Sequence, residues 1–321
     1  MRFDFWRLIT APALFAVAVA AVAQDYPNRP VRVLVPYGSG TGVDLVARAV
    51  ADRLTKNLGQ PFVIENRPGA AGTIAGAMVA AAPGDGYTLL IDTASITTVA
   101  ALIRNLPYDP RRDFAPVAMI SSTPLVLVSA ASHGYRSVKD LVAAGKAKPG
   151  SISFASAGIG TTTHLSAERF RIAAGFDALH VPYKTTTDAL ADVIAGRVTY
   201  LITSPATLIG SIKEGRLVAL GMSVHRTPML PNVPTLAEAG VPNAETNAWF
   251  ALFAPAKTPP DIIARLHREV QNALGAADIR QRFIELGVEA HAMTVREFET
   301  QLRREYAEGE QLVKSAGIKL D

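Results

Sequence analysis

Three segments rich in glycine, serine and threonine, 37–42, 156–163 and 184–187, each stand between an apolar run and an amphipathic helical pattern. The start of a helix has unpaired backbone N–H groups and the positive end of the helix dipole, so it binds anions without a cationic side chain. Glycine lets the backbone approach a ligand, and hydroxyl groups add donors that suit either oxygen of a carboxylate. The same residues also serve as ordinary helix caps. Because the segments recur in two successive α/β series, we favour an anion-binding cleft.

Other chemistries fit these residues less well. The spacing of Gly38, Gly40 and Gly42 is not the G-x-G-x-x-G of dinucleotide-binding folds, and the acidic residue expected about 20 positions further on is missing. A nucleophile pair of Ser156 and His164 would lack an orienting acid and a strained elbow. No H-E-x-x-H sequence indicates a metal, and cysteine is absent. The sequence therefore predicts no cofactor, no metal site and no enzymatic activity.

Two residues near these segments have open roles. His164 falls in the first turn of its predicted helix, where it either donates to a ligand oxygen or bonds its own loop. Lys184 either pairs with a ligand carboxylate or is a solvated residue before a helix. Residue type alone does not decide between these alternatives.

Short apolar runs that alternate with helical patterns predict an α/β fold with largely parallel sheets. The predicted strands are 31–35, 62–64, 87–91, 124–129, 152–155, 179–183, 198–203, 217–222 and 249–254. Between the first two, the spacing of Val43, Val46, Val50 and Leu54 predicts a buried helix face. We also expect Thr258, which precedes two prolines, to cap a late helix.

The N-terminus has the form of an export signal. Residues 8–23 are almost wholly apolar, follow Arg2 and Arg7, and end in the small-x-small pattern Ala21-Val22-Ala23. This run would span about 24 Å as a helix, short of the roughly 30 Å hydrocarbon core. We expect a cleaved signal peptide, residues 1–23, and a periplasmic mature chain; an uncleaved anchor is the alternative. The net charge of +4 comes without basic runs, so it suits a small anion and not nucleic acid.

Several motifs, spread in order along nearly the whole mature chain, resemble the Bug-type receptors of tripartite tricarboxylate transporters, a set of bacterial periplasmic solute-binding proteins. The matching segments are Val35-Pro-Tyr37, Asp44-Leu-Val-Ala-Arg48, Glu65-Asn-Arg-Pro-Gly-Ala70, Gly84-Asp-Gly-Tyr-Thr-Leu-Leu90, Asp113-Phe-Ala-Pro-Val117, Phe154-Ala-Ser156, His164-Leu165, His180-Val-Pro-Tyr-Lys184, Leu230-Pro-Asn-Val-Pro-Thr235 and Leu252-Phe-Ala-Pro255.

The resemblance implies a two-lobed, type II-like flytrap with two chain crossings. Lobe I would comprise 24–123 and 248–321, and lobe II 124–247. Such a receptor would be a monomer that captures a small carboxylate-bearing anion and delivers it to inner-membrane transporter subunits. A sensor feeding a signalling system and, less well supported, an exported hydrolase are the alternatives. By resemblance, the ligand contacts are Tyr37, Gly38, Ser39, Gly40, Thr41, Thr93, Ala94, Ser95, Ser156, Gly158, Thr161, Thr162, His164, Lys184, Thr203 and Ser204.

The chain departs from the family pattern at positions that bear on the ligand. Members often have Asp where this chain has Thr199 and Thr203, and Asn where it has Ile159. A threonine at 203 removes a carboxylate partner for a ligand amine. We therefore expect a non-amino anion, with an apolar or aromatic body, over an amino acid.

Overall fold

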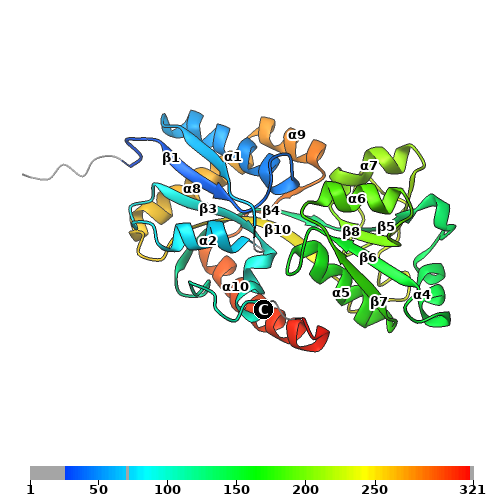
Figure 1. Cartoon of the computed structure of the whole chain (residues 1–321). Helices are drawn as coiled ribbons and strands as arrows, with labels where there is room; N and C mark the ends of the chain where they lie inside the picture. The colour runs from blue at the N-terminus through cyan, green and yellow to red at the C-terminus, as the bar shows by residue number, and fades with distance from the viewer. Residues whose placement is uncertain (1–25, 70–71, 319–321) are drawn as a thin grey trace, which may run out of the picture.

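A computed structural model describes residues 26–69 and 72–318, so the predicted signal peptide, 1–23, lies outside the described residues. Two β-sheets lie side by side, each covered by helices, and β4 and β10 run through the region between the two halves (Figure 1). Within the described ranges, no helix is both long and apolar enough to cross a membrane. The mixed α/β architecture was predicted correctly from the alternating sequence pattern.

Lobe I is built on a six-stranded sheet in the order β11-β4-β10-β3-β1-β2. Strands β1, β2 and β3 are parallel, and β10 is antiparallel to both β3 and β4. The strands are β1 (Val31–Val35), β2 (Phe62–Asn66), β3 (Thr88–Thr93), β4 (Phe114–Pro124), β10 (Asn247–Pro255) and β11 (Glu289–Ala290). The helices are α1 (Gly42–Leu58), α2 (Thr73–Ala80), the 3-10 helix η2 (Ala94–Thr97), α3 (Val99–Leu102), α8 (Pro260–Gly275), α9 (Ala277–Leu286) and α10 (Val295–Ala316).

Lobe II is built on a five-stranded sheet in the order β7-β6-β8-β5-β9. Strands β6, β7 and β8 are parallel, and β5 is antiparallel to β8 and β9. The strands are β5 (Val126–Ala130), β6 (Ile152–Ser156), β7 (Ala178–Pro182), β8 (Tyr200–Thr203) and β9 (Leu217–Met222). The helices are the 3-10 helix η3 (Ala131–His133), α4 (Val138–Ala147), α5 (Thr162–Ala174), α6 (Thr186–Ile194) and α7 (Pro205–Lys213).

The two sheets share one topology. The order β2-β1-β3-β10-β4 in lobe I matches β7-β6-β8-β5-β9 in lobe II. In each lobe the antiparallel strand is the one that enters from the other lobe: β5 follows β4 through Leu125, and β10 follows the segment 223–246. The predicted lobe limits, 123/124 and 247/248, fall inside β4 and β10, next to these two passages, and they remain a proposal.

The core explains how these elements hold the turns in place. In α1, the side chains of Val43, Val46, Val50 and Leu54 are buried against the sheet, as their spacing predicts. Apolar clusters pack on both faces of each sheet. Parallel strands that end inside such a core place their following turns at one common edge of the sheet. In the sheet of lobe I this edge carries the turn after β1, and in the sheet of lobe II the corresponding edge carries the turn after β6.

Candidate functional site: two facing turns

The turn of lobe I, residues 37–41, joins β1 to α1. Thr41 is the N-cap residue of α1, with φ −72° and ψ 159°, and its Oγ1 donates to the carbonyl oxygen of Gly38 at 2.8 Å. Gly40 has φ +81°, the left-handed region that favours glycine. Its N–H donates to Asp44 Oδ2 at 2.8 Å, so a side chain of α1 fixes the turn from below.

Asp44 is 1% exposed, and three groups compensate the negative charge of its carboxylate. Besides the Gly40 N–H, Arg48 lies 3.0 Å from Oδ1 and the Asn66 amide donates to Oδ1 at 2.8 Å. Burial opposes ionisation, but the hydrogen bonds from Arg48, Gly40 and Asn66 outweigh it and lower the pKa of Asp44. The lobe I turn therefore rests on an ionised carboxylate.

Beside this turn, the hydroxyl groups of Tyr37, Thr93 and Ser95 form a closed cluster. Tyr37 Oη lies 2.9 Å from Thr93 Oγ1 and 2.8 Å from Ser95 Oγ, and the latter two atoms are 2.8 Å apart. Burial raises the pKa of Tyr37, so its phenol stays protonated. The three hydroxyl groups have one proton each, and these protons form the three hydrogen bonds of the cluster. A carboxylate that binds here would accept a hydrogen bond from one of the three hydroxyl groups. We call Tyr37, Thr93 and Ser95 the hydroxyl cluster.

The turn of lobe II, residues 157–161, joins β6 to α5 in the same way. Thr161 is the N-cap residue, with φ −71° and ψ 160°, and its Oγ1 donates to Gly158 O at 2.7 Å. Gly160 has φ +82°, and its N–H donates to His164 Nδ1 at 3.0 Å. His164 is 2% exposed. The structure thus gives His164 the loop-bonded role that the sequence left open, and direct contact with a ligand stays a prediction.

A second histidine that the sequence did not single out supports this turn. The rings of His164 and His180 stack with centroids 3.9 Å apart, and Phe154 continues the stack at 4.8 Å from His180. His180 Nε2 lies 2.7 Å from Ser156 Oγ, which accepts the N–H of Gly158. Burial lowers the pKa of His180 to about 4; burial and the neighbouring His180 lower that of His164 to about 3. Both rings are neutral at physiological pH.

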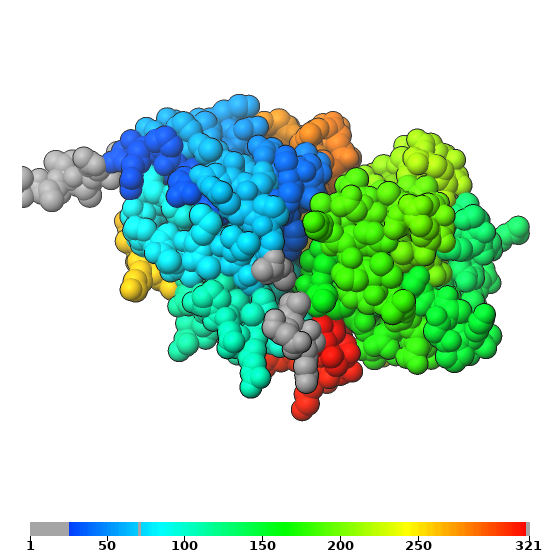
Figure 2. Space-filling view, in the orientation of Figure 1, coloured from blue at the N-terminus to red at the C-terminus, as the bar shows by residue number. Residues whose placement is uncertain are grey.

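The two lobes touch where these turns face each other. Thr93 Oγ1 of lobe I lies 3.4 Å from Thr162 Oγ1 at the start of α5 in lobe II. Figure 2 shows the two lobes in contact along their facing sides. A cavity of about 300 Å³ lies next to this contact, lined by η2, α5, the segment before β10 and α10. Of the predicted contacts, Ala94 and Ser95 of lobe I and Thr162 of lobe II belong to its lining, and the turns 37–41 and 157–161 do not.

The interlobe cavity also contains a cation that the sequence did not indicate. Arg169 of α5 lines it, and Arg169 Nη1 donates to the carbonyl oxygen of Glu245 at 3.3 Å. Arg169 stands in an ordinary amphipathic helix, so only the three-dimensional arrangement identifies it. Within the described residues, no group of histidine and carboxylate side chains could hold a metal ion.

The remaining predicted contacts lie in different settings. Ser39 and Lys184 are exposed, and Ala94 is half-buried next to the hydroxyl cluster. Thr203 is buried at the end of β8, and Ser204 follows it as the N-cap residue of α7. Among the described residues, Ser204 Oγ is buried without a hydrogen-bond partner, as expected of a donor that a ligand would satisfy. Whether these residues contact a ligand stays a prediction.

Thr199, the other position where family members often have Asp, lies away from the turns. It precedes β8, at the end of the sheet opposite Ser156, and its Oγ1 accepts the N–H of Ser153 at 3.1 Å. A substitution at this position therefore bears on the sheet and not on the turns. The expectation of a non-amino ligand rests on Thr203 alone.

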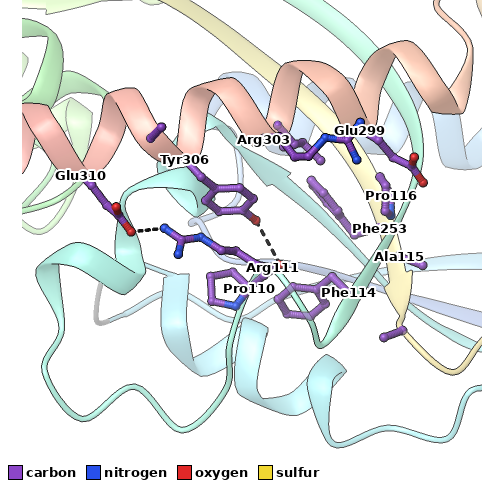
Figure 3. A pocket seen from close by; sticks show the side chains of 13 residues that line it. Pro110, Arg111, Phe114, Ala115, Pro116, Phe253, Glu299, Arg303, Tyr306 and Glu310 are labelled. Atoms are coloured by element: carbon purple, nitrogen blue, oxygen red, sulfur yellow. Dashed lines mark hydrogen bonds and ion pairs between the residues drawn. The ribbon is translucent and has the colours of Figure 1, made fainter.

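A larger hollow, of about 550 Å³, lies on lobe I between the loop before β4 and α10 (Figure 3). Its floor is apolar, and its polar rim is satisfied within the lobe. Arg111 pairs with Glu310, and the Tyr306 hydroxyl donates to Pro110 O at 3.0 Å. Because lobe II contributes no lining residue, closure of the lobes cannot enclose a ligand there. We place the candidate site between the facing turns instead.

Comparisons with known proteins define the class to which this fold and site belong. An R. palustris protein solved with adipate is 36% identical, with a TM-score of 0.86 over 92% of this chain and 99% of that one. MatC from Rhodopseudomonas palustris, solved with bound malate, is 31% identical, with a TM-score of 0.83 over 90% and 100%. The fold is that of the two-lobed periplasmic binding proteins.

Sequence relatives give the particular family. The model of the tripartite tricarboxylate transporter family receptor, TctC, matches residues 46–318, and the chain belongs to this family. Protein BugT of Bordetella pertussis is 35% identical over 88% of both chains. A UPF0065 protein of a Pseudomonas species is 38% identical over 88% of this chain and 85% of the relative. The resemblance stated from the sequence is confirmed, and the chain is a receptor of the solute-binding type.

Proposed function

We propose that this protein is a periplasmic receptor that closes its two lobes on a small carboxylate-bearing anion and delivers it to a membrane transporter. The observation that carries the proposal is the approach of Thr93 and Thr162, which brings the end of β3 in lobe I to the start of α5 in lobe II. The family and the neighbours solved with adipate and malate support the same class of ligand. Removal of residues 1–23 as a signal peptide belongs to this proposal.

The turns supply hydrogen-bond donors in place of a cationic clamp. In both turns the N-cap threonine donates to the first glycine, and the middle glycine donates to a side chain of the following helix, which fixes the remaining N–H groups before a ligand arrives. A hydrogen bond to a charged group contributes about 1.5–3 kcal/mol, and micromolar affinity needs about 8 kcal/mol. Four or five such bonds reach this value after part is lost to the entropy of association. No proton transfer or covalent step is required.

Closure links binding to transport. Contacts from both lobes exist together only when the lobes are closed, so a ligand that uses both favours the closed state. The passages at Leu125 and 223–246 are the parts of the chain that join the lobes, and we propose them as the hinge. A membrane partner that recognises the closed arrangement would then distinguish loaded from empty receptor.

The ligand we propose is an anion without an amino group. The end of β8 offers the hydroxyl groups of Thr203 and Ser204 and no carboxylate that would pair with an ammonium group. Ile159 adds an apolar side chain to the lobe II turn. Dicarboxylates and aromatic acids suit these surroundings better than aspartate or glutamate.

A thermal-shift screen of the chain from Gln24 onward tests the proposal, after any co-purified ligand has been removed by unfolding and refolding. The panel contains mono-, di- and tricarboxylates, aromatic acids, acidic amino acids and neutral sugars. A ligand at 100 times its Kd stabilises by about 2.7 kcal/mol, which raises the melting temperature by about 4–5 °C for a chain of this size. Increases in melting temperature that are confined to one class of acids without an amino group support the proposal. Shifts with sugars alone, or tighter binding of aspartate, would overturn it.

A further inference from the structure

The two turns are structural duplicates. Gly38, Gly40 and Thr41 correspond to Gly158, Gly160 and Thr161, because the N-cap threonines have the same dihedral angles and the same bond to the first glycine. The middle glycines share φ values of +81° and +82°. In each turn the middle glycine donates its N–H to the residue four positions later.

The turns differ at the first glycine, where Gly158 but not Gly38 has a positive φ, and at that fourth residue, which is Asp44 in lobe I and His164 in lobe II. Four positions further along the helix, the order of charges is reversed: Arg48 follows Asp44, whereas Glu168 follows His164. In lobe I the acid touches the turn and the base lies behind it. In lobe II a neutral ring touches the turn and the acid lies behind it.

The contacts around His164 fix its proton. Nδ1 accepts the Gly160 N–H, so the ring proton is on Nε2, which lies 4.0 Å from Glu168 Oε1. Glu168 is 6% exposed and is held by Arg171 at 2.7 Å, so the cation nearest to it is already engaged. An acid at position 164 would therefore face a second buried acid, without the compensation that Arg48 and Asn66 give Asp44.

We infer that His164 is a positioning residue, the neutral counterpart of Asp44, which holds the Gly160 N–H without placing a negative charge under the lobe II turn. The consequence for ligand binding rests on the proposed function: a carboxylate bound at this turn lies above His164, a neutral hydrogen-bond acceptor. In lobe I the acceptor is the negatively charged carboxylate of Asp44, whose charge is compensated by contacts with Arg48 and Asn66. The lobe II turn then contributes more of the anion affinity than the lobe I turn.

Matched variants at position 164 separate geometry from charge. Asn presents an acceptor oxygen close to the position of Nδ1, and Asp presents the same oxygen with a charge. With adipate, malate and benzoate as probes at pH 7.5, we expect His164→Asn to change Kd by less than about threefold. Because two nearby like charges repel strongly in a buried setting, His164→Asp should weaken binding by about tenfold or more. Equal affinities for the two variants would overturn the role of charge.

A measurement without ligand tests the positioning role separately. The ¹⁵N chemical shifts of the ring in the wild-type protein should show a protonated Nε2 and an unprotonated Nδ1. In His164→Ala, the Gly160 amide should exchange with solvent faster, and His164→Asn should restore its protection. A ring proton on Nδ1, or unchanged Gly160 exchange in His164→Ala, would overturn the inference. If no acid binds the wild type, the proposed function and the charge argument fail together, while the tautomer and exchange data still decide the positioning role.

Discussion

Thr93 Oγ1 at the end of β3 in lobe I lies 3.4 Å from Thr162 Oγ1 at the start of α5 in lobe II, so the two hydroxyl groups form a direct side-chain link between the lobes. Thr93 also belongs to the hydroxyl cluster, so the contacts of a ligand bound there depend on the position of α5. The link is long for an O–H···O bond, whose usual length is 2.5–3.0 Å. It therefore contributes little by itself, and a bound anion that bridges both hydroxyl groups would contribute more.

The first prediction concerns this bridge. Thr162→Val keeps the shape of the side chain but removes its hydroxyl group, so the loss of a bond to a charged ligand should weaken acid binding by about tenfold. The melting temperature of the free protein should change by no more than about 1 °C, because the 3.4 Å link is weak. Isothermal titration with the acid that gives the largest thermal shift measures the first value. Thr207→Val, on the exposed side of α7, is the control, and an equal effect of both variants would contradict the prediction.

The second prediction concerns the hydroxyl cluster. Tyr37→Phe removes the atom that contacts both Thr93 and Ser95 and should lower the free energy of unfolding by about 1–2 kcal/mol. It should also weaken acid binding, because the two remaining hydroxyl groups lose the partner that orients them. Urea unfolding and titration measure the two effects. Tyr135→Phe, outside this cluster, serves as the control. Reduced stability with unchanged affinity would assign Tyr37 a structural role only.

The third prediction concerns acid stability. Burial holds the pKa values of His164 and His180 at about 3 and about 4, below the value near 6.5 of an unfolded chain. As the pH falls below about 6.5, the unfolded state takes up protons first, so the folded state loses up to about 1.4 kcal/mol per pH unit for each histidine. His180→Gln removes one of these groups, so relative to the wild type its free energy of unfolding should rise by about 2 kcal/mol between pH 6.5 and pH 4.5.

The measurement for this third prediction is urea unfolding at four pH values across that range. His225→Gln is the matched control, since the His225 side chain is 44% exposed and lies outside the stack. Parallel pH profiles of His180→Gln and the wild type from pH 6.5 to 4.5 would contradict the buried, neutral state of His180.

Much of the fold could be predicted because its signals are local. The strand Val31–Val35 was predicted with its observed limits, and α1 buries the face that its spacing indicates. Strand β4 was missed, since Pro116 and the polar run Ser121-Ser122-Thr123 do not resemble a strand until β10 pairs with them. Thr258 was wrongly predicted as a cap. Pro259 is the N-cap residue of α8, and Thr258 Oγ1 is buried without a partner within the described residues.

The site was predicted less completely for a physical reason. Turn composition indicates where N–H groups converge, so the segments 37–42 and 156–163 were selected from sequence alone. The stack of His180 on His164 depends on the pairing of β6 with β7, which no local pattern reveals. The sequence shows Gly-x-Gly-Thr in both turns, but not the shared dihedral angles or the shared acceptor position, which is Asp44 in one turn and His164 in the other.

The fourth prediction concerns Asp92, which is 4% exposed at the end of β3, next to Thr93. Its Oδ1 accepts the Thr93 N–H at 2.7 Å, but burial dominates and raises the pKa of Asp92 to about 7. The folded state therefore keeps this proton at pH values where the unfolded chain, with a pKa near 3.9, has lost it. Between about pH 4 and 7, the stability contributed by this group falls as the pH rises, by up to about 1.4 kcal/mol per pH unit.

Asp92→Asn is neutral at every pH and lacks this dependence. Relative to the wild type, its free energy of unfolding should rise by about 1–3 kcal/mol between pH 5 and pH 8, even if the substitution costs a constant amount at both. Urea unfolding of both proteins at the two pH values measures this difference. Asp177→Asn, at a side chain that is 81% exposed, provides the control and should show a difference near zero. Parallel pH profiles for Asp92→Asn and the wild type would mean that Asp92 is ionised in the folded protein, with a charge directly beneath the hydroxyl cluster that is proposed to receive an anion.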